Sequence, residues 1–180
     1  EQVDRAAEVV RRFREFIRLG RSEKQLVTVA EIVSEAQSFC RPELERCSVE
    51  LNAKLAGNLP KIMVDALQIE QVIANLVRNA VEALSQAGRL DGRVTIEAEC
   101  GAPGMIEVRV RDNGPGFDVN LTEHPITPFT TTKHDGLGLG LSLARSIVEA
   151  HGGKLRIDSS PRGATVSFTL QSIPNAETAP

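Results

Sequence analysis

The sequence predicts an α+β fold, a two-layer sandwich whose mixed, mostly antiparallel sheet is covered by helices on one face and preceded by a bundle-type helix. Three observations predict it: strand-like segments alternate apolar and polar residues, short turns join some of them in pairs, and the helical segments carry an apolar stripe along one side. We therefore expect one domain over residues 25–171, preceded by a helix and linker over residues 1–24 and followed by a tail over residues 172–180.

Residues 1–19 are predicted to form a helix with a coiled-coil-like seam. Its apolar residues alternate spacings of three and four: Val3, Ala6, Val10, Phe13 and Ile17. The charged remainder favours packing in a helix bundle, although packing on the following domain is also open. Because one short seam is marginal, we expect weak association of the chain with itself. The pattern is already helical at Glu1, so we interpret the chain as a piece of a longer protein.

The first half of the domain is predicted to alternate short strands with two capped helices. A strand candidate, QLVTV, leads to Thr28 and Glu31, whose spacing indicates a capping box and a helix to about Cys40. Residues 49–55 alternate as a strand and residues 61–64 form another. Asp65 with Gln68 caps the next helix. The stripe of that helix is expected to comprise Leu67, Val72, Ile73, Leu76, Ala80, Val81 and Leu84.

The second half is predicted to contain two hairpins that flank a long irregular segment and a helix. Residues 94–98 and 106–110 alternate around the turn CGAPGM, and residues 154–159 and 164–170 form a closing hairpin. A helix over residues 138–151 ends at Gly152 and Gly153. The segment 113–137 lacks a periodic pattern, and a connection of that length in a compact domain is usually functional.

Composition excludes several classes of function. The net charge is −3, and aromatic residues make up 3% of the chain, with no Trp or Tyr. Neither a basic field nor stacking platforms for bases are present, so we expect no nucleic-acid partner. Neither a membrane-length apolar run nor a signal peptide is found, so we expect a cytoplasmic location for this part of a parent that a membrane could still anchor. Three cysteines, an odd number, fit a reducing compartment.

Glycines at alternate positions precede the predicted helix 138–151. Gly136, Gly138 and Gly140 match neither a dinucleotide-binding loop nor a P-loop. Glycine nevertheless lets a backbone approach an anion closely, and a helix N-terminus presents free N–H groups. A phosphate cradle and a flexible hinge both remain open at this point.

A carboxylate and two amides are further candidates for a binding site. Asp112 ends a predicted strand before Gly114 and Gly116, where a carboxylate can accept a hydrogen bond from the exocyclic amine of a base. Asn75 and Asn79 lie four residues apart on one helix face, and an amide oxygen suits Mg²⁺. An ordinary Asp-Asn-Gly turn and backbone-satisfied asparagines are the alternatives.

Taken together, four boxes resemble the ATP-binding catalytic domain of sensor histidine kinases, within the GHKL ATPase superfamily. They are NLVRNAVEAL over residues 75–84, DNGPGF over 112–117, PFTTTK over 128–133 and GLGLGL over 136–141. The last helix and hairpin also look like those of the family. The resemblance covers roughly residues 25–170, and four boxes in order are far more specific than any one of them.

The resemblance implies cofactors and residue roles. ATP and Mg²⁺ are expected, with Asp112 holding the adenine amine, Gly116 and Thr165 lining the base pocket, Asn79 binding Mg²⁺ and Asn75 near the phosphates. Residues 118–137 would form a lid, anchored by Phe129. Catalytic roles are implied for Asn75, Asn79 and Lys133, and further nucleotide contacts for Glu82, Gly114, Thr132, Lys133, Gly136, Leu137, Gly138, Leu139 and Gly140.

Two positions refine this interpretation. Hydrolysing members of the superfamily look like E-x-x-x-N, and Asn75 stands where they carry the Glu that serves as a base, so we expect poor hydrolysis and transfer to another nucleophile. Glu82 departs from the Lys or His that many histidine kinases carry at this position near the phosphates. It resembles a nitrogen- and oxygen-sensing subgroup instead.

The expected phosphoacceptor is missing from the chain. His124, His134 and His151 lack the context of the family's phosphorylated histidine, and helix 1–19 looks like the end of the bundle that carries it. The expected partners are therefore ATP or ADP, a histidine-bearing dimerisation domain within a homodimer, and a response regulator. An anti-sigma-type serine kinase or switch module of the same fold, and a scaffold that has lost activity, are the alternatives.

Overall fold

A five-stranded sheet backed by three helices forms the body of the molecule. The computed structural model describes residues 23–116 and 140–173, so the expected helix 1–19 lies outside the described residues. The sheet has the order β2-β4-β5-β7-β6, in which β2 runs parallel to β4 and the other pairs are antiparallel. Its strands are β2 (Glu50–Leu55), β4 (Arg93–Cys100), β5 (Met105–Asp112), β6 (Leu155–Ser160) and β7 (Gly163–Gln171).

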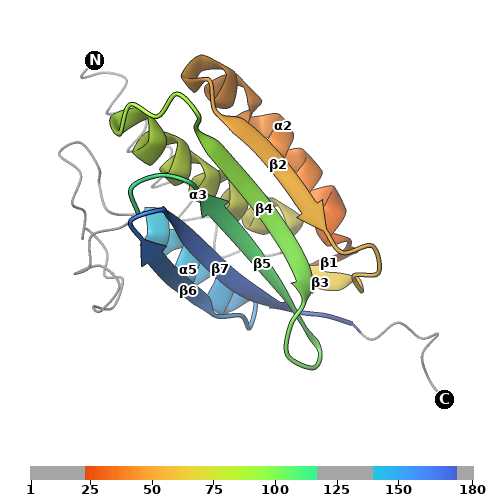
Figure 1. Cartoon of the computed structure of the whole chain (residues 1–180). Coiled ribbons are helices and arrows are strands. Elements are labelled where there is room, and N and C mark those ends of the chain that lie inside the picture. Colours follow the sequence, from red (N-terminus) through yellow and green to blue (C-terminus); the bar gives the residue numbers. More distant parts are fainter. Residues whose placement is uncertain (1–22, 117–139, 174–180) are drawn as a thin grey trace.

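All three described helices cover the same face of this sheet (Figure 1). They are α2 (Val29–Cys47), α3 (Ala66–Gln86) and α5 (Gly140–Ala150). Two further strands, β1 (Gln25–Val27) and β3 (Ile62–Val64), pair antiparallel in a small separate sheet. The predicted α+β sandwich with a mixed, mostly antiparallel sheet is therefore confirmed.

The core lies between the sheet and the helices, because aliphatic side chains from both layers meet there. Ile96 on β4 and Val108 on β5 are fully buried, as are Ile73 and Leu84 on α3 and Phe168 on β7. Removing this apolar surface from water drives the two layers together. Among the described residues, no helix is apolar over a length that could cross a bilayer.

Helix α2 begins where the sequence predicts and ends later. Thr28 caps it, and Glu31 reaches back to the Thr28 backbone N–H at 2.8 Å, so the capping box is confirmed. The predicted end near Cys40 is wrong, because the helix continues through Pro42 to Cys47. Burial of Leu44, one turn beyond Cys40, extends the apolar stripe and offsets the helix bond that Pro42 cannot donate.

Helix α3 carries the predicted cap and most of the predicted stripe. The Asp65 carboxylate accepts a hydrogen bond from the Gln68 N–H at 3.2 Å, which satisfies one of the unpaired donors of the first turn. The assignment of Leu67 to the stripe is wrong, since this side chain is 50% exposed and Ile69 is buried instead. The remaining stripe residues are buried: Val72, Ile73, Leu76, Ala80, Val81 and Leu84.

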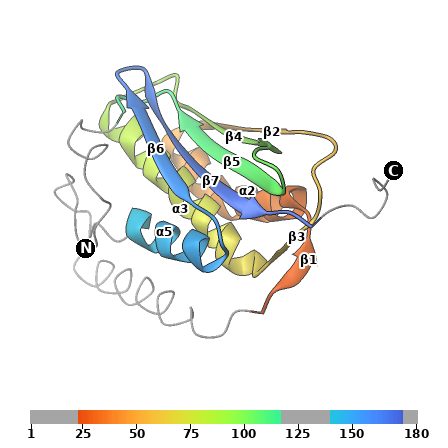
Figure 2. The same ribbon diagram turned by 90° about the horizontal axis from the view of Figure 1, so that it is seen from below.

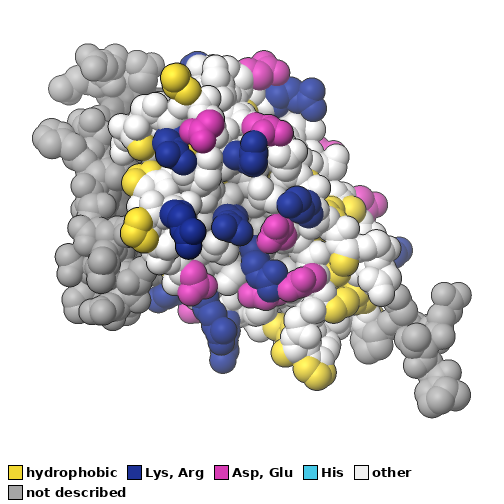
Figure 3. All heavy atoms as spheres, in the orientation of Figure 1, with side chains coloured by type: hydrophobic (Ala, Val, Ile, Leu, Met, Phe, Trp, Pro, Cys, Tyr) yellow, Lys and Arg dark blue, Asp and Glu magenta, His cyan; other side chains and the backbone are white. Residues whose placement is uncertain are grey.

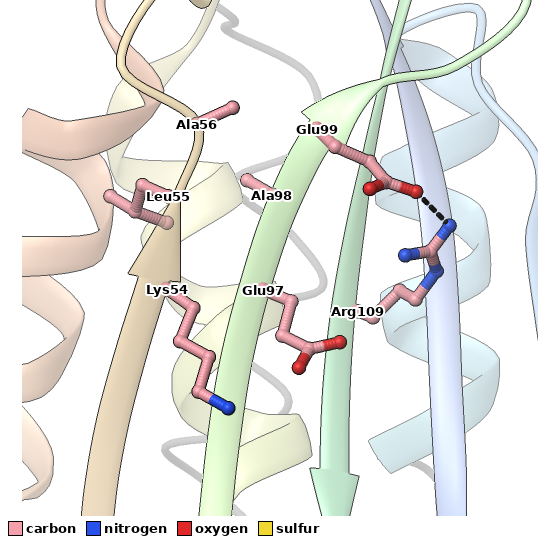
Figure 4. A pocket seen from close by; sticks show the side chains of 7 residues that line it. All are labelled: Lys54, Leu55, Ala56, Glu97, Ala98, Glu99 and Arg109. Atoms are coloured by element: carbon pink, nitrogen blue, oxygen red, sulfur yellow. Dashed lines mark hydrogen bonds and ion pairs between the residues drawn. The ribbon is translucent and has the colours of Figure 1, made fainter.

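The face of the sheet away from the helices is charged. Lysine, arginine and acidic side chains alternate across it (Figure 3), and Arg109 forms ion pairs with Glu99 and Glu107. A hollow of about 360 Å³ lies among Lys54, Glu97, Glu99 and Arg109 (Figure 4). Its charged walls largely neutralise one another, and it lies on the opposite face from Asp112.

Candidate nucleotide site

Asp112 ends β5 on the helix-covered side and is buried. Its Oδ1 accepts hydrogen bonds from the backbone N–H groups of Gly114 at 2.8 Å and Ala164 at 3.3 Å. Among the described residues, both hydrogen bonds found for this carboxylate go to Oδ1, which leaves Oδ2 as an acceptor for a ligand. Burial raises the pKa of Asp112 above its ordinary value, and the two N–H donors partly oppose that rise.

Glycines allow the loop after β5 and the β6–β7 turn to lie close together around Asp112. Gly163 has φ +138°, and a Cβ there would lie 2.0 Å from the Asp112 carbonyl oxygen. Gly116 has φ +81°, and a Cβ there would lie 2.3 Å from the carbonyl oxygen of Ser160. Any side chain at either position would therefore force apart the loop after β5 and the β6–β7 turn.

The structure does not bring Thr165 together with Asp112. Side chains alternate between the two faces of β7. Thr165 pairs in register with Arg111, the residue that precedes Asp112 on β5. Its side chain is therefore on the charged face of the sheet. Ala164 faces the helix side and contributes its N–H to Asp112. Sequence reasoning missed Ala164 because a backbone donor carries no residue-type signal.

A second group of predicted residues meets where α3 passes the start of α5. A Cβ added to Gly140 would lie 2.8 Å from Asn75 Oδ1 and 3.1 Å from its Nδ2. The Asn75 Nδ2 atom is buried without a hydrogen-bond partner among the described residues. Burying an unpaired amide is costly, so its retention here points to a ligand. Asn79 and Glu82 lie further along α3 and are half-buried.

Helix α3 connects the two groups. A Cβ on Gly114 would lie 3.5 Å from Leu84 Cδ2, so the Asp112 turn packs on α3 nine residues beyond Asn75. At the rise of an α-helix this is about 13 Å, a span that an extended nucleoside triphosphate can bridge. The structure thus brings Asp112, Gly114 and Gly116 to one end of a path along α3, and Asn75 and Gly140 to the other.

The expected lid lies outside the described residues, so its residues stay predictions. These are Phe129, Thr132, Lys133, Gly136, Leu137, Gly138 and Leu139, together with His124 and His134. Of the three histidines, His151 is described and is buried at the end of α5. Its sequence context differs from that of the family's phosphoacceptor histidine.

Comparison with known proteins agrees with this geometry. Residues 64–174 match the family described as histidine kinase-, DNA gyrase B-, and HSP90-like ATPase. The match begins at Val64 and includes all of α3, β4, β5, α5, β6 and β7, the elements that carry the Asp112 and Asn75 groups. The chain belongs to this family of ATPase domains.

Individual relatives narrow the class. The sensor protein FixL of Bradyrhizobium diazoefficiens is 39% identical over 171 residues, covering 94% of this chain and 34% of FixL. The C4-dicarboxylate transport sensor protein DctS of Rhodobacter capsulatus is 36% identical over 174 residues, covering 96% of this chain and 26% of DctS. The chain thus spans about a third or less of the length of these two relatives.

Solved structures agree. The nucleotide-free catalytic domain of the histidine kinase ThkA superposes with a TM-score of 0.72 at 28% identity, covering 83% of this chain and 96% of that domain. Together with the sensor proteins, this similarity confirms the predicted histidine kinase ATP-binding catalytic domain.

Proposed function

We propose that the chain binds ATP and transfers its γ-phosphoryl group to a histidine on a dimerisation domain outside this sequence. The observation that carries the proposal is the Asp112 carboxyl group, whose Oδ1 is occupied by two backbone N–H donors. The remaining oxygen can accept the exocyclic amine of adenine, and it would repel the carbonyl oxygen that guanine presents at that position. Adenine selectivity follows from this chemistry.

The phosphate end is proposed to use the amides of α3. Asn79 supplies a side-chain oxygen of the kind that Mg²⁺ prefers, and Mg²⁺ would neutralise charge on the phosphates. Asn75 carries a buried amide nitrogen without a partner among the described residues, a donor that suits a phosphate oxygen. Lys133, outside the described residues, would add a positive charge at the terminal phosphate.

The nature of residue 75 supports transfer rather than hydrolysis. A neutral amide cannot accept the proton of an attacking water, so Asn75 gives water no general base. In the proposed reaction an imidazole nitrogen attacks the γ-phosphorus, the bond to the β,γ-bridging oxygen breaks, and ADP leaves. The imidazole N–H proton passes to solvent, which leaves a phosphohistidine that can donate to a response regulator.

The remaining partners follow from this proposal. The histidine would belong to a dimerisation bundle in a homodimer of the complete protein. Residues 1–19 would form the end of the second helix of that bundle. We place the domain in the cytoplasm, where ATP is available, whether or not the parent is anchored in a membrane. Neither the charge nor the composition of the chain suggests a nucleic-acid partner.

Calorimetric titration with ATP and with GTP in the presence of Mg²⁺ tests the proposal. Asp112→Asn keeps an oxygen for the two N–H donors and replaces the free oxygen with an amine donor, so we expect ATP affinity to fall at least about tenfold. Asp158→Asn makes the same chemical change on the exposed side of β6, and we expect wild-type affinity.

Either of two results would overturn this function. One is the absence of ATP binding by the wild-type chain, which would favour the scaffold interpretation. The other is equal affinity for ATP and GTP that Asp112→Asn leaves unchanged, since the carboxyl group would then have no role in choosing the base.

A further inference from the structure

His151 joins the end of α5 to the start of α3 through both ring nitrogens. Its Nδ1 lies 2.8 Å from the carbonyl oxygen of Ile147, one turn back on α5. Its Nε2 lies 3.1 Å from the backbone nitrogen of Asp65, the N-cap of α3. The ring is buried, 5% exposed, so water does not compete freely for these two bonds.

The partners of His151 fix its protonation pattern. The Asp65 N–H can only donate, so Nε2 must be the unprotonated acceptor. The Ile147 carbonyl can only accept, so Nδ1 must carry the proton. The side chain therefore acts as a neutral bridge, with a donor toward its own helix and an acceptor toward the next one.

This bridge lies at one end of a pair of helices whose other end is the nucleotide site. Helices α3 and α5 lie side by side and run in opposite directions (Figure 2). Asp65 and Asn75 are ten residues apart on α3, and Gly140 and His151 are eleven apart on α5, which corresponds to about 15 and 16 Å. The two contacts, His151 with Asp65 and Gly140 with Asn75, therefore hold α5 at matching positions along α3.

The surroundings make the His151 end a fixed point. Gly153 follows so closely on β7 that a Cβ there would lie 1.8 Å from the Thr169 carbonyl oxygen. The Asp65 carboxylate accepts bonds from the N–H groups of Gln68 at 3.2 Å and Glu23 at 3.3 Å. The bond between His151 and Asp65 therefore ties the end of α5 to a place where β7, the segment before β1 and the N-cap of α3 meet.

At the other end of α5, Gly140 lies close to the Asn75 side chain. A Cβ on Gly140 would already be 2.8 Å from Asn75 Oδ1, so a shift of about 1 Å would either separate the pair or force it together. A tilt of about 4° about the His151 end of an α5 some 16 Å long moves the other end by that amount. A displacement of this size at a functional site can lower activity strongly.

We propose that His151 is a positioning residue for the nucleotide site: its bond to the Asp65 N–H sets where α5 lies along α3 and so holds Gly140 against Asn75. The inference rests on the proposed function, in that Asn75 and Gly140 contact the phosphates of ATP. It adds a role for a residue outside the four boxes, some 16 Å of helix from the site.

Two substitutions separate the hydrogen bond of His151 to Asp65 from its hydrogen bond to Ile147. In His151→Gln the side-chain oxygen reaches the position of Nε2 and can still accept from the Asp65 N–H. In His151→Asn the shorter amide can still donate to the Ile147 carbonyl but falls short of Asp65. Both variants lose the imidazole ring and its packing. If packing of the ring were the whole role of His151, both variants would therefore lose ATP affinity to the same extent.

ATP titrations of the wild-type chain and both variants test the proposal. We expect His151→Asn to bind ATP about three- to tenfold more weakly, the range for losing one hydrogen bond, and His151→Gln to bind within about twofold of the wild type. Equal affinities in the two variants, whether both normal or both reduced, would overturn the positioning role. If the wild-type chain binds ATP and the variants do not differ, only this inference fails; if the wild type does not bind, the proposed function fails with it.

A measurement on the wild-type chain alone keeps the proposal testable should His151→Asn not fold. Nitrogen NMR of the histidine ring reports which nitrogen carries the proton, and hydrogen exchange reports the protection of the Asp65 amide. We expect a proton on Nδ1 and a protected amide with or without nucleotide. A proton on Nε2, or a rapidly exchanging Asp65 amide, would show that the bridge does not form.

Discussion

The two ends of the nucleotide site are built from different materials. At the base end, backbone N–H groups hold the Asp112 carboxyl group, and Gly163 and Gly116 let the chain close around it. At the phosphate end, the closeness of Asn75 to Gly140 depends on where α5 lies along α3, and the Asn75 Nδ2 atom is left without a partner among the described residues.

The two ends differ in the structural change that disrupts their geometry. The base end is part of the sheet, so its geometry changes only if the strand ends separate, which also lowers the free energy of unfolding. The phosphate end depends on the placement of one helix relative to another, so small displacements alter it without unfolding the domain. Substitutions at the two ends should therefore differ in how they divide their effect between stability and nucleotide affinity.

The largest effect is expected at Gly163. Gly163→Ala places a methyl group 2.0 Å from the Asp112 carbonyl oxygen at φ +138°, so we expect the free energy of unfolding to fall by about 3 kcal/mol or more. Chemical denaturation measures it. Gly57→Ala is the matched control, because a Cβ there meets nothing within 4 Å. Equal stability of the two variants would contradict the close approach described at the base end.

A smaller effect is expected from pH, again at the base end. Because burial raises the pKa of Asp112, its folded value lies above the unfolded value of about 3.9. Its contribution to stability is therefore present below the unfolded value and is lost as the pH rises through the folded value. ATP affinity should change in the opposite direction, falling as the pH drops through the raised pKa, because a protonated Oδ2 no longer accepts the amine.

Titrations from about pH 7 down through the ordinary aspartate value of about 3.9 measure this dependence. Asp112→Asn removes the titrating group and should abolish that step while leaving any titration of the phosphates. A wild-type profile that coincides in shape with the Asp112→Asn profile would show that Asp112 is not the group responsible.

The smallest effect is expected at Gly140. Gly140→Ala adds a methyl group 2.8 Å from Asn75 Oδ1, which the Asn75 side chain can relieve by rotating. We expect the free energy of unfolding to change by less than about 1 kcal/mol and ATP affinity to fall about threefold to tenfold. Calorimetric titration and denaturation of the same sample separate the two quantities. A larger loss of stability than of binding would remove the contrast between the two ends.

Much of the fold could be predicted from the sequence, because local signals specified it. The capping box at Thr28, the cap at Asp65 and the alternating residues of β4 and β5 each state their own structure. The end of α2 was missed because Pro42 normally interrupts a helix, and only packing of Leu44 against the core outweighs it. Leu67 was misplaced because an apolar residue in the first turn looks like part of the stripe.

The site divides in the same way. Asp112, Asn75 and Gly140 could be named from their motifs, because glycine and amide side chains at fixed spacings have a chemical meaning. The hydrogen bond from Ala164 and the bridge from His151 could not, since they depend on tertiary contacts 52 and 86 residues away in the chain. Thr165 shows the limit of a motif match, because a shift of one residue along a strand changes the face on which a side chain lies.

The two edge strands of the five-stranded sheet have a further consequence. Among the described strands, β2 and β6 each pair on one side only, so both present unpaired backbone groups to their surroundings. Charged side chains occupy both strands, Glu50 and Lys54 on β2 and Arg156 and Asp158 on β6. Such charges oppose the addition of a foreign strand, so both edges of the described sheet carry side chains that disfavour edge-to-edge pairing between copies of the domain.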